Sequence, residues 1–162
     1  MEHIEHSIQP VYDAHSRVLL LGTMPSPKSR EYGFFYGHPQ NRFWRVLAAV
    51  LEEPLPHTNE EKRALLLRRH VALWDVLAAC DIEGAQDASI KNPVPNDFTA
   101  LLGEADIRAV FTTGGTAFRL YQKLVYPHTR LAAVRLPSTS PANCSVGLEA
   151  LTAQYAAILQ YL

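Results

Sequence analysis

The apolar residues of the chain form short runs that alternate with stretches of helical spacing. Short apolar runs that end at a glycine, a proline or a polar residue are typical of strands buried on both faces. Four such runs predict strands over residues 17–22, 71–76, 107–112 and 131–136.

Helices are predicted between and after these strands. A capping box at Thr58–Glu61 marks the start of one helix, and Asp97 can cap a short helix that ends at Gly103. Residues 80–97 are predicted to be irregular. The predicted helices run from Asn41 to before Pro54, from Thr58 to about Arg69, from Asp97 to Gly103 and over 116–125, and a closing helix carries Leu148, Leu151, Tyr155, Ile158, Leu159 and Leu162 on one face.

Alternation of strands and helices predicts the α/β class. We expect one three-layer α/β/α domain over residues 1–162, with a central, mainly parallel four-stranded sheet. Ligands of such folds bind outside the carboxyl ends of the strands. The segments GTMPSPKS, WDV, TTGG and LPSTSPAN follow the four predicted strands, so we expect them to meet at one edge of the sheet.

The composition of the chain bears on where the protein is located and on whether it holds a metal or another cofactor. The sequence holds no uncharged apolar run of 18 residues, and its start, MEHIEHSIQP, is unlike a signal peptide, so no membrane segment is expected. The two cysteines, Cys80 and Cys144, lie far apart, and the seven histidines lack metal-ligand spacing. We therefore expect a cytoplasmic protein without a metal or another cofactor.

The formal net charge is −1, but the charges are not evenly spread. Lys28, Arg30, Arg42 and Arg45 face a single acid, Glu31, in the segment between Ser26 and Arg45. This cluster could bind a few phosphates or could simply be a solvated surface.

Three segments together resemble the uracil-DNA glycosylase superfamily, and most closely its hypoxanthine-DNA (deoxyinosine) glycosylase branch. They are GTMPS at residues 22–26, GHPQNRFW at 37–44 and LPSTSPAN at 136–143. The HPxNRFW stretch is also similar to that of the mismatch-specific uracil/thymine glycosylases. In the uracil-specific branch an Asp occupies the position of Met24, a Tyr that of Ser26, and a catalytic His that of Ser138. The roles of those groups therefore cannot be transferred to this chain.

The resemblance implies that Asn41 carries the reaction. Its carbonyl could orient a water, or its amide could donate to the departing base. The alternative is a helix N-cap, for which asparagine is well suited. Lys28 as a Schiff-base nucleophile is disfavoured, because nothing in the sequence suggests a lowered pKa.

An extruded base needs an aromatic face and a polar rim. Tyr36 aligns with the stacking residue of the family, whereas Phe34 and Phe35 could equally be core residues. Asp75 aligns with the base-reading residue of uracil-specific relatives and, as a carboxylate, could accept the N1–H of hypoxanthine; alternatively it caps the following turn. The predicted base-binding residues are Gly22, Thr23, Met24, Pro25, Tyr36 and Asp75.

Short polar and basic side chains in the two flanking loops are predicted to hold the DNA backbone. His38 could instead stabilise its own loop, and PSTSP could be an ordinary connector. The predicted DNA contacts are Ser26, Lys28, Ser29, Arg30, His38, Ser138, Thr139, Ser140 and Asn143.

The leading hypothesis is a monofunctional glycosylase that hydrolyses deoxyinosine in damaged DNA by base flipping and leaves an abasic site. We expect it to act as a nucleoid-associated monomer. Alternatives are a uracil- or mismatch-specific glycosylase and a non-catalytic binder of damaged DNA. A free-nucleotide domain ranks last, because the sequence lacks both GxxxxGK[ST] and GxGxxG.

Overall fold

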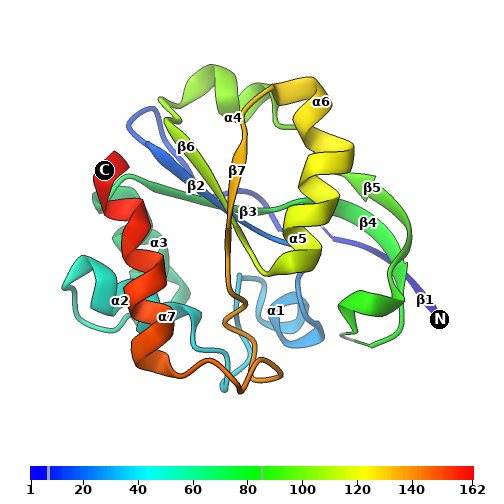
Figure 1. Cartoon of the computed structure of the whole chain (residues 1–162), viewed down its shortest axis with the longest axis horizontal. Helices are drawn as coiled ribbons and strands as arrows, with labels where there is room; N and C mark the ends of the chain where they lie inside the picture. The colour runs from blue at the N-terminus through cyan, green and yellow to red at the C-terminus, as the bar shows by residue number, and fades with distance from the viewer. Residues whose placement is uncertain (7, 85) are drawn as a thin grey trace.

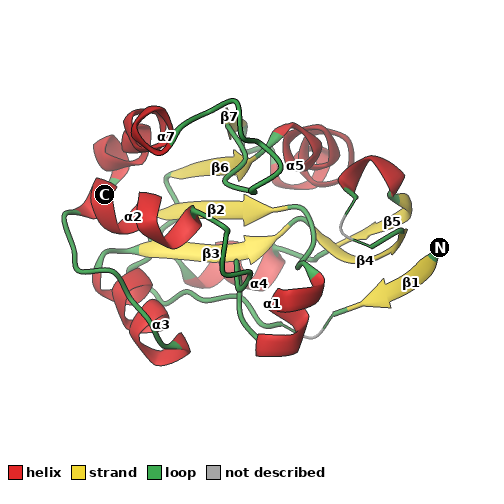
Figure 2. Ribbon diagram, turned by 90° about the horizontal axis from the view of Figure 1, so that it is seen from below, coloured by secondary structure: helices red, strands yellow, loops and turns green. Residues whose placement is uncertain are grey.

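A four-stranded parallel sheet forms the centre of the molecule. The computed structural model of the protein describes residues 1–6, 8–84 and 86–162. The strand order is β3-β2-β6-β7, and every neighbouring pair is parallel. Figure 2 shows β6, β2 and β3 stacked and pointing the same way. The predicted central sheet is confirmed, with strands β2 (Val18–Gly22), β3 (Val71–Asp75), β6 (Ala109–Thr113) and β7 (Ala133–Leu136).

Helices cover both faces of this sheet, as expected for a three-layer α/β fold (Figure 1). Along β2, Val18 and Leu20 join the core beside α2, α3 and α7, whereas Leu19 and Leu21 join the core beside α4 and α5. This alternation buries both faces of the strand. The helices are α1 (Pro27–Tyr32), α2 (Phe43–Leu51), α3 (Asn59–Arg68), α4 (Thr99–Glu104), α5 (Gly115–Leu120), α6 (Tyr126–Thr129) and α7 (Leu148–Tyr155).

A second, antiparallel sheet corrects the expectation that residues 80–97 are irregular. Strand β4 (Leu77–Ile82) lies between β1 (Glu2–Glu5) and β5 (Lys91–Pro95), and a 3₁₀ turn spans Asp87–Ser89. Residue 85, within this segment, lies outside the described residues. Prolines at 93 and 95 concealed β5, but an edge strand tolerates them because one side of its backbone needs no ladder partner.

Two helix predictions also need correction. The helix after Gly114 does not end at residue 125 but continues through a π-helical turn, Tyr121–Val125, into α6. The closing helix changes to a 3₁₀ helix over Ala156–Tyr161, and this change of pitch leaves Leu159 44% exposed. Leu148, the first residue of α7, is also 44% exposed. Leu151, Tyr155 and Ile158 of that helix are buried as predicted.

The predicted cap at Thr58 is confirmed, because its hydroxyl accepts a hydrogen bond from the backbone N–H of Glu61 at 3.0 Å. Asp97 lies one residue before the N-cap of α4, Phe98, and its carboxylate accepts the backbone N–H of Thr99 at 2.9 Å; this helix ends at Glu104 rather than at Gly103. The Glu61 carboxylate reaches back to the N–H of His57, one residue before the expected partner.

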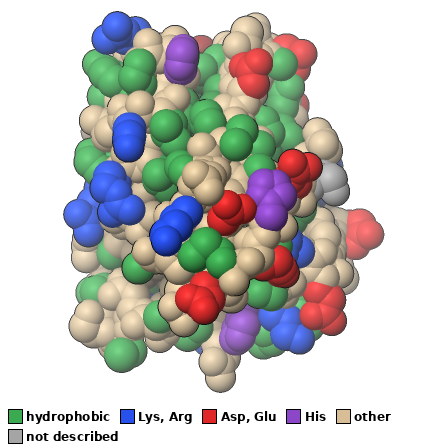
Figure 3. Space-filling model, turned by 90° about the vertical axis from the view of Figure 1, so that its right-hand side faces the viewer, with side chains coloured by type: hydrophobic (Ala, Val, Ile, Leu, Met, Phe, Trp, Pro, Cys, Tyr) green, Lys and Arg blue, Asp and Glu red, His purple; other side chains and the backbone are tan. Residues whose placement is uncertain are grey.

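The surface over the second sheet is mixed in charge. On the side that carries α6, β4 and β5, acidic, basic and histidine side chains are interspersed with apolar ones (Figure 3). Among the described residues, no helix is long and apolar enough to cross a membrane.

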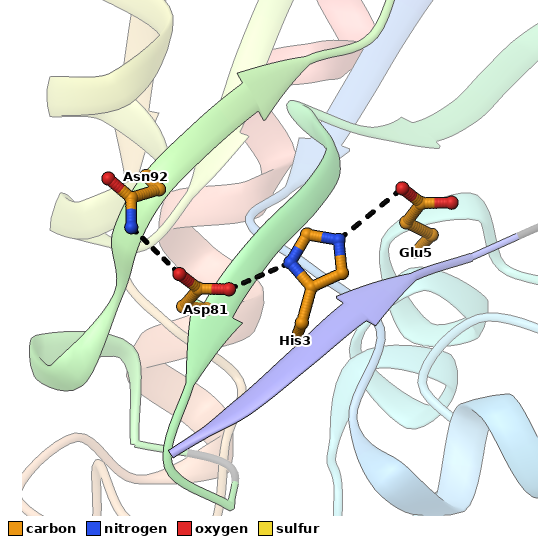
Figure 4. Close-up of polar contacts among 4 residues, drawn as sticks. All are labelled: His3, Glu5, Asp81 and Asn92. Atoms are coloured by element: carbon orange, nitrogen blue, oxygen red, sulfur yellow. Dashed lines mark hydrogen bonds and ion pairs between the residues drawn. The ribbon is translucent and has the colours of Figure 1, made fainter.

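A polar chain on this surface joins β1 to β4 (Figure 4). The His3 Nδ1 lies 2.7 Å from an Asp81 carboxylate oxygen, and its Nε2 lies 3.3 Å from Glu5. Asn92 donates to the other oxygen of Asp81 at 2.7 Å. Hydrogen bonds to Asp81 and Glu5 raise the pKa of His3, because they favour the protonated imidazole.

We expect Asp81→Asn to lower the pKa of His3, measured by NMR titration of the imidazole protons. Because the raised pKa belongs to the folded state, the contribution of this contact to β1 docking is present at low pH and lost as pH rises through that pKa. Asp106→Asn, which removes an exposed acid paired with Arg108, is the matched control. An unchanged His3 titration in Asp81→Asn would refute this account.

Candidate functional site

The predicted site residues gather where the strand order changes direction. The chain passes from β2 to β3 on one side and later returns to β6 on the other side of β2, so the loops after β2 and β6 diverge at a topological switch point. The Tyr36 hydroxyl bridges this point, because it lies 2.8 Å from the Thr113 hydroxyl at the end of β6.

Gly22 is required at the end of β2 by close packing. A Cβ at this position would lie 2.7 Å from an Asp75 carboxylate oxygen and 2.9 Å from the Tyr36 hydroxyl. Both approaches are shorter than normal contacts, so a larger residue would displace one of these two side chains. The glycine thus lets residues from two other segments converge.

Tyr36 is placed to present an aromatic face. Its ring stacks on the buried Phe43 with centroids 3.9 Å apart and planes within 8°, and the partly exposed residue lines a surface pocket. Its φ of 52° lies in the left-handed region that non-glycine residues adopt uncommonly. Phe34 and Phe35 are buried in the core, so the structure supports the core alternative for both.

Asp75 is buried beside this ring, with 4% of its surface exposed. Its Oδ2 has no hydrogen-bond partner among the described residues. The backbone N–H groups of Val76 and Leu77 bond to carbonyl oxygens of residues 22 and 23 rather than to the carboxylate, which argues against the turn-capping alternative. Burial, and secondarily the charge of Asp87, raises the pKa of Asp75 to about 8.

Asp87 was not among the predicted site residues, because it lies in the segment predicted to be irregular. Its carboxylate accepts a hydrogen bond from the Thr23 hydroxyl at 3.3 Å and acts electrostatically on both Asp75 and Tyr36. Thr113 was also missed, although its place at the carboxyl end of β6 was a usable signal.

The side chain of Asn41 joins the two flanking loops. Its Oδ1 accepts one hydrogen bond from the Thr139 hydroxyl at 2.8 Å and another from the backbone N–H of Phe43 at 2.9 Å. Two donors fix the amide orientation and occupy both lone pairs of the oxygen. The Nδ2 group remains the available donor. The helix-capping alternative is therefore compatible with a second role for the NH₂ group.

Arg42 holds the same two loops together, which neither alternative for the basic cluster, phosphate binding or a solvated surface, had foreseen. Its guanidinium donates to the carbonyl oxygens of Ser140, Asn143 and Val146, and its backbone N–H donates to the carbonyl of Thr139. These bonds use the guanidinium to order the 137–146 loop beside Asn41.

The predicted DNA contacts divide by accessibility. Ser29 and Thr139 are 2% and 1% exposed, and their hydroxyls hold the backbone N–H of Gly37 and the Asn41 side chain respectively. Direct phosphate contact is therefore assigned to neither. Lys28 is exposed but pairs with Glu31 at 3.3 Å.

The remaining predicted contacts stay predictions, and most of them also shape their own loops. The hydroxyls of Ser26, Ser138 and Ser140 accept bonds from backbone N–H groups. The Ser26 O–H also donates to the Ser29 hydroxyl at 3.2 Å, so this side chain holds the start of its own helix. Asn143 donates to the carbonyl of Ser138. Arg30 is partly exposed, and His38 accepts the backbone N–H of Gln40 at Nδ1.

A pocket of about 390 Å³ opens beside Tyr36 and Asn41. We call it the outer pocket, because its other walls come from the 37–39 loop, the start of α2, the 55–57 segment and Lys62 on α3. The predicted base-binding residues 22–25 and Asp75 do not line it. They lie toward the phenol oxygen of Tyr36, where Pro25 is buried and Met24 packs against the apolar core.

In the described part of the chain, no group of three or more His, Cys, Asp or Glu side chains is arranged to hold an ion. The buried cysteine, Cys80, and the exposed one, Cys144, are both unpaired.

Comparison with known proteins agrees with this architecture. The family model of the uracil DNA glycosylase superfamily matches residues 9–162. The chain therefore belongs to the uracil DNA glycosylase superfamily, a family of DNA glycosylases, and the family suggested by the sequence motifs is confirmed.

Two relatives are named hypoxanthine DNA glycosylase. The protein of Methanosarcina acetivorans is 32% identical over 141 residues, which cover 86% of this chain and 89% of the relative. That of Methanosarcina barkeri is 39% identical over 93 residues, covering 57% of this chain and 59% of the relative. The NMR solution structure of a candidate uracil DNA glycosylase from M. acetivorans is also similar, with a TM-score of 0.78, 29% identity, and coverage of 94% of this chain and 96% of that one.

Asp75→Asn is expected to change the pH dependence of stability. An unfolded aspartate titrates near pH 4 and the folded one near pH 8, so the folded state binds more protons between these values. The wild-type free energy of unfolding should therefore fall as pH rises through this window, by at most about 1.4 kcal/mol per pH unit. In urea unfolding from pH 5 to 8, the free energy of unfolding of Asp75→Asn should therefore rise relative to that of the wild-type protein as the pH increases. A difference between the two proteins that does not change with pH would contradict the raised pKa.

Arg42→Lys should destabilise the protein by about 1.5–3 kcal/mol, because one ammonium cannot reach the three carbonyl oxygens that the guanidinium binds. Arg45→Lys, on the exposed side of the same helix, is the control, with an expected change within about 0.5 kcal/mol. Equal urea midpoints for the two variants would show that the Arg42 contacts are unimportant.

Proposed function

We propose that the protein is a monofunctional DNA glycosylase that removes hypoxanthine from deoxyinosine by base flipping and leaves an abasic site. The observation that carries this proposal is the fixed amide of Asn41, which lies between the two loops that resemble the family motifs and keeps its NH₂ group available. The two relatives named hypoxanthine DNA glycosylase support the choice of base.

The reaction assigned to Asn41 is electrostatic. Cleavage of the glycosidic bond leaves negative charge on the departing purine and positive charge on the sugar. A donor held in place before the reaction stabilises such developing charge without reorganisation and can contribute about 10²–10³ in rate. The Asn41 oxygen already accepts two bonds, so donation by Nδ2 is favoured over water orientation by Oδ1. No carboxylate stands at position 24, where Met24 lies.

The base is proposed to stack on the ring of Tyr36, with its polar edge toward Asp75 and the backbone of residues 22–25. At pH 7 an Asp75 with a pKa of about 8 is mostly neutral. A neutral carboxylic acid can accept the N1–H of hypoxanthine and donate to its O6, which gives two bonds rather than the one expected of an ionised carboxylate.

This protonation state alters the expected specificity. A neutral acid can also pair with adenine, so Asp75 alone does not explain how adenine would be rejected. The stable pairing of adenine in the duplex, and its poorer ability to leave as an anion, must then contribute to the selectivity. Uracil carries the same N–H and carbonyl pair as hypoxanthine. Uracil excision is therefore the second candidate activity, and the similarity to the M. acetivorans structure named as a candidate uracil DNA glycosylase favours testing it.

Asn41→Asp separates the two possible roles of this residue. Aspartate keeps an oxygen for Thr139 and for the Phe43 N–H but replaces the NH₂ donor by a second oxygen. If donation drives the reaction, Asn41→Asp should lose about 10²–10³ in single-turnover rate, much like Asn41→Ala. The assay is hot-alkali cleavage of duplexes that each carry one deoxyinosine, deoxyuridine or deoxyxanthosine.

Two results would count against the proposal. Wild-type rates in Asn41→Asp would exclude donation and restore water orientation as the role of the side chain. Affinity of the wild-type protein for lesions without any abasic product would indicate a non-catalytic binder of damaged DNA.

A further inference from the structure

The outer pocket has a chemical character of its own. Arg45, on the first turn of α2, and Lys62, on α3, line it from two sides, and His38 and His57 complete the polar wall. Within the described residues none of the lining side chains is acidic, and neither Arg45 nor Lys62 has an ion-pair partner.

The position of Lys62 is set by an aromatic contact. Its ammonium group lies 5.3 Å from the ring centroid of Trp44, which is nearly buried, and partial burial lowers the pKa of the lysine. The nearby acid Glu61 accepts the backbone N–H of His57. The ammonium group of Lys62 is therefore held at the pocket without a neutralising carboxylate.

The rest of the lining is apolar and partly open. Leu55 is 40% exposed, and Pro39 and Pro56 lie on the same surface. A pocket that joins unpaired cations to apolar walls suits a nucleotide unit, whose phosphate is anionic and whose sugar and base offer apolar faces.

Continuity with Asn41 and Tyr36, which also line this pocket, identifies the strand that would occupy it. We infer that the outer pocket binds a nucleotide next to the extruded one on the damaged strand, with its phosphodiester between Arg45 and Lys62 and its sugar against Leu55 and Pro56. This inference rests on the proposed function, because it takes the extruded base to lie at Tyr36 and Asn41.

Two other described parts of the surface do not offer this combination. The side that carries α6, β4 and β5 mixes acidic with basic side chains (Figure 3). On α1, Lys28 is paired with Glu31, and the Arg42 guanidinium is bonded to backbone carbonyls. Arg45 and Lys62 thus replace Lys28 and Arg42 as the principal phosphate contacts on this flank of the site.

The test compares Arg45→Gln/Lys62→Gln with the wild-type protein on a duplex that carries one deoxyinosine. The enzyme concentration for half-maximal single-turnover excision is measured over a series of salt concentrations. Loss of two phosphate contacts should lower the slope of log affinity against log salt by about 2 and weaken binding about tenfold or more at low salt. The two substitutions should raise the half-saturating enzyme concentration much more than they lower the maximal single-turnover rate.

Arg63→Gln/Lys123→Gln is the matched control, since it removes the same charge from two exposed residues that do not line the pocket. A salt slope in Arg45→Gln/Lys62→Gln equal to the wild-type slope, or an equal fall in the control, would overturn the inference. If loss of the Trp44 contact unfolds the double variant, Arg45→Gln alone should lower the slope by about 1.

Neutral methylphosphonate linkages, placed one at a time beside the lesion, locate the phosphate. One linkage should weaken wild-type binding but add nothing to the double variant; additive losses at every position would contradict the assignment. Free inorganic phosphate at the same ionic strength should compete poorly, because the pocket takes the phosphate as part of the strand. Direct binding of the same duplexes, measured by fluorescence anisotropy over the same salt series, keeps this test independent of catalysis. A wild-type protein that binds DNA with the expected slope but releases no base would refute the proposed function, and the binding slopes of the variants would still test the pocket.

Discussion

The hydrogen bond from Thr139 to the Asn41 oxygen is the contact on which the candidate site depends. The two residues lie 98 positions apart in the sequence, and this bond closes the loop before α2 onto the loop after β7. Arg42 strengthens the same junction with three bonds to backbone carbonyls. The Arg42 guanidinium is partly buried, and its two terminal nitrogens bond to these carbonyls while Nε has no partner among the described residues. These bonds hold the loop after β7 beside Asn41, so the amide is oriented before any substrate binds.

The parallel sheet provides the second constraint. The carboxyl ends of β2, β3 and β6 meet at the switch point, where Gly22, Asp75 and Thr113 end their strands side by side. Because residue 22 is a glycine, the carboxyl group of Asp75 and the phenol oxygen of Tyr36 can both lie in the space that a side chain at this position would occupy. Burial there keeps Asp75 largely neutral at pH 7, which converts an expected acceptor into a group that both accepts and donates.

Asn41 and Tyr36 lie where two parts of the candidate site meet. Both residues line the outer pocket, whose cations are unpaired among the described residues, and the phenol oxygen of Tyr36 lies near Gly22 and Asp75. Many of the hydroxyl groups in the flanking loops hold those loops in shape. A protein of nearly zero net charge can then bind a polyanion through a few well-placed cations, and such binding is sensitive to salt.

The sequence alone determined the central sheet, most helices and the family, because apolar periodicity and capping residues act locally and because three motifs occur in order along the chain. It placed Gly22, Tyr36, Asn41 and Asp75 in one site. It did not reveal strand β5, whose prolines are tolerated only at a sheet edge, or the contact of Asp87 with Thr23. The role of Arg42, the protonation of Asp75 and the saturation of the Asn41 oxygen were decided only by the tertiary structure, since each depends on partners or burial supplied by segments distant in sequence.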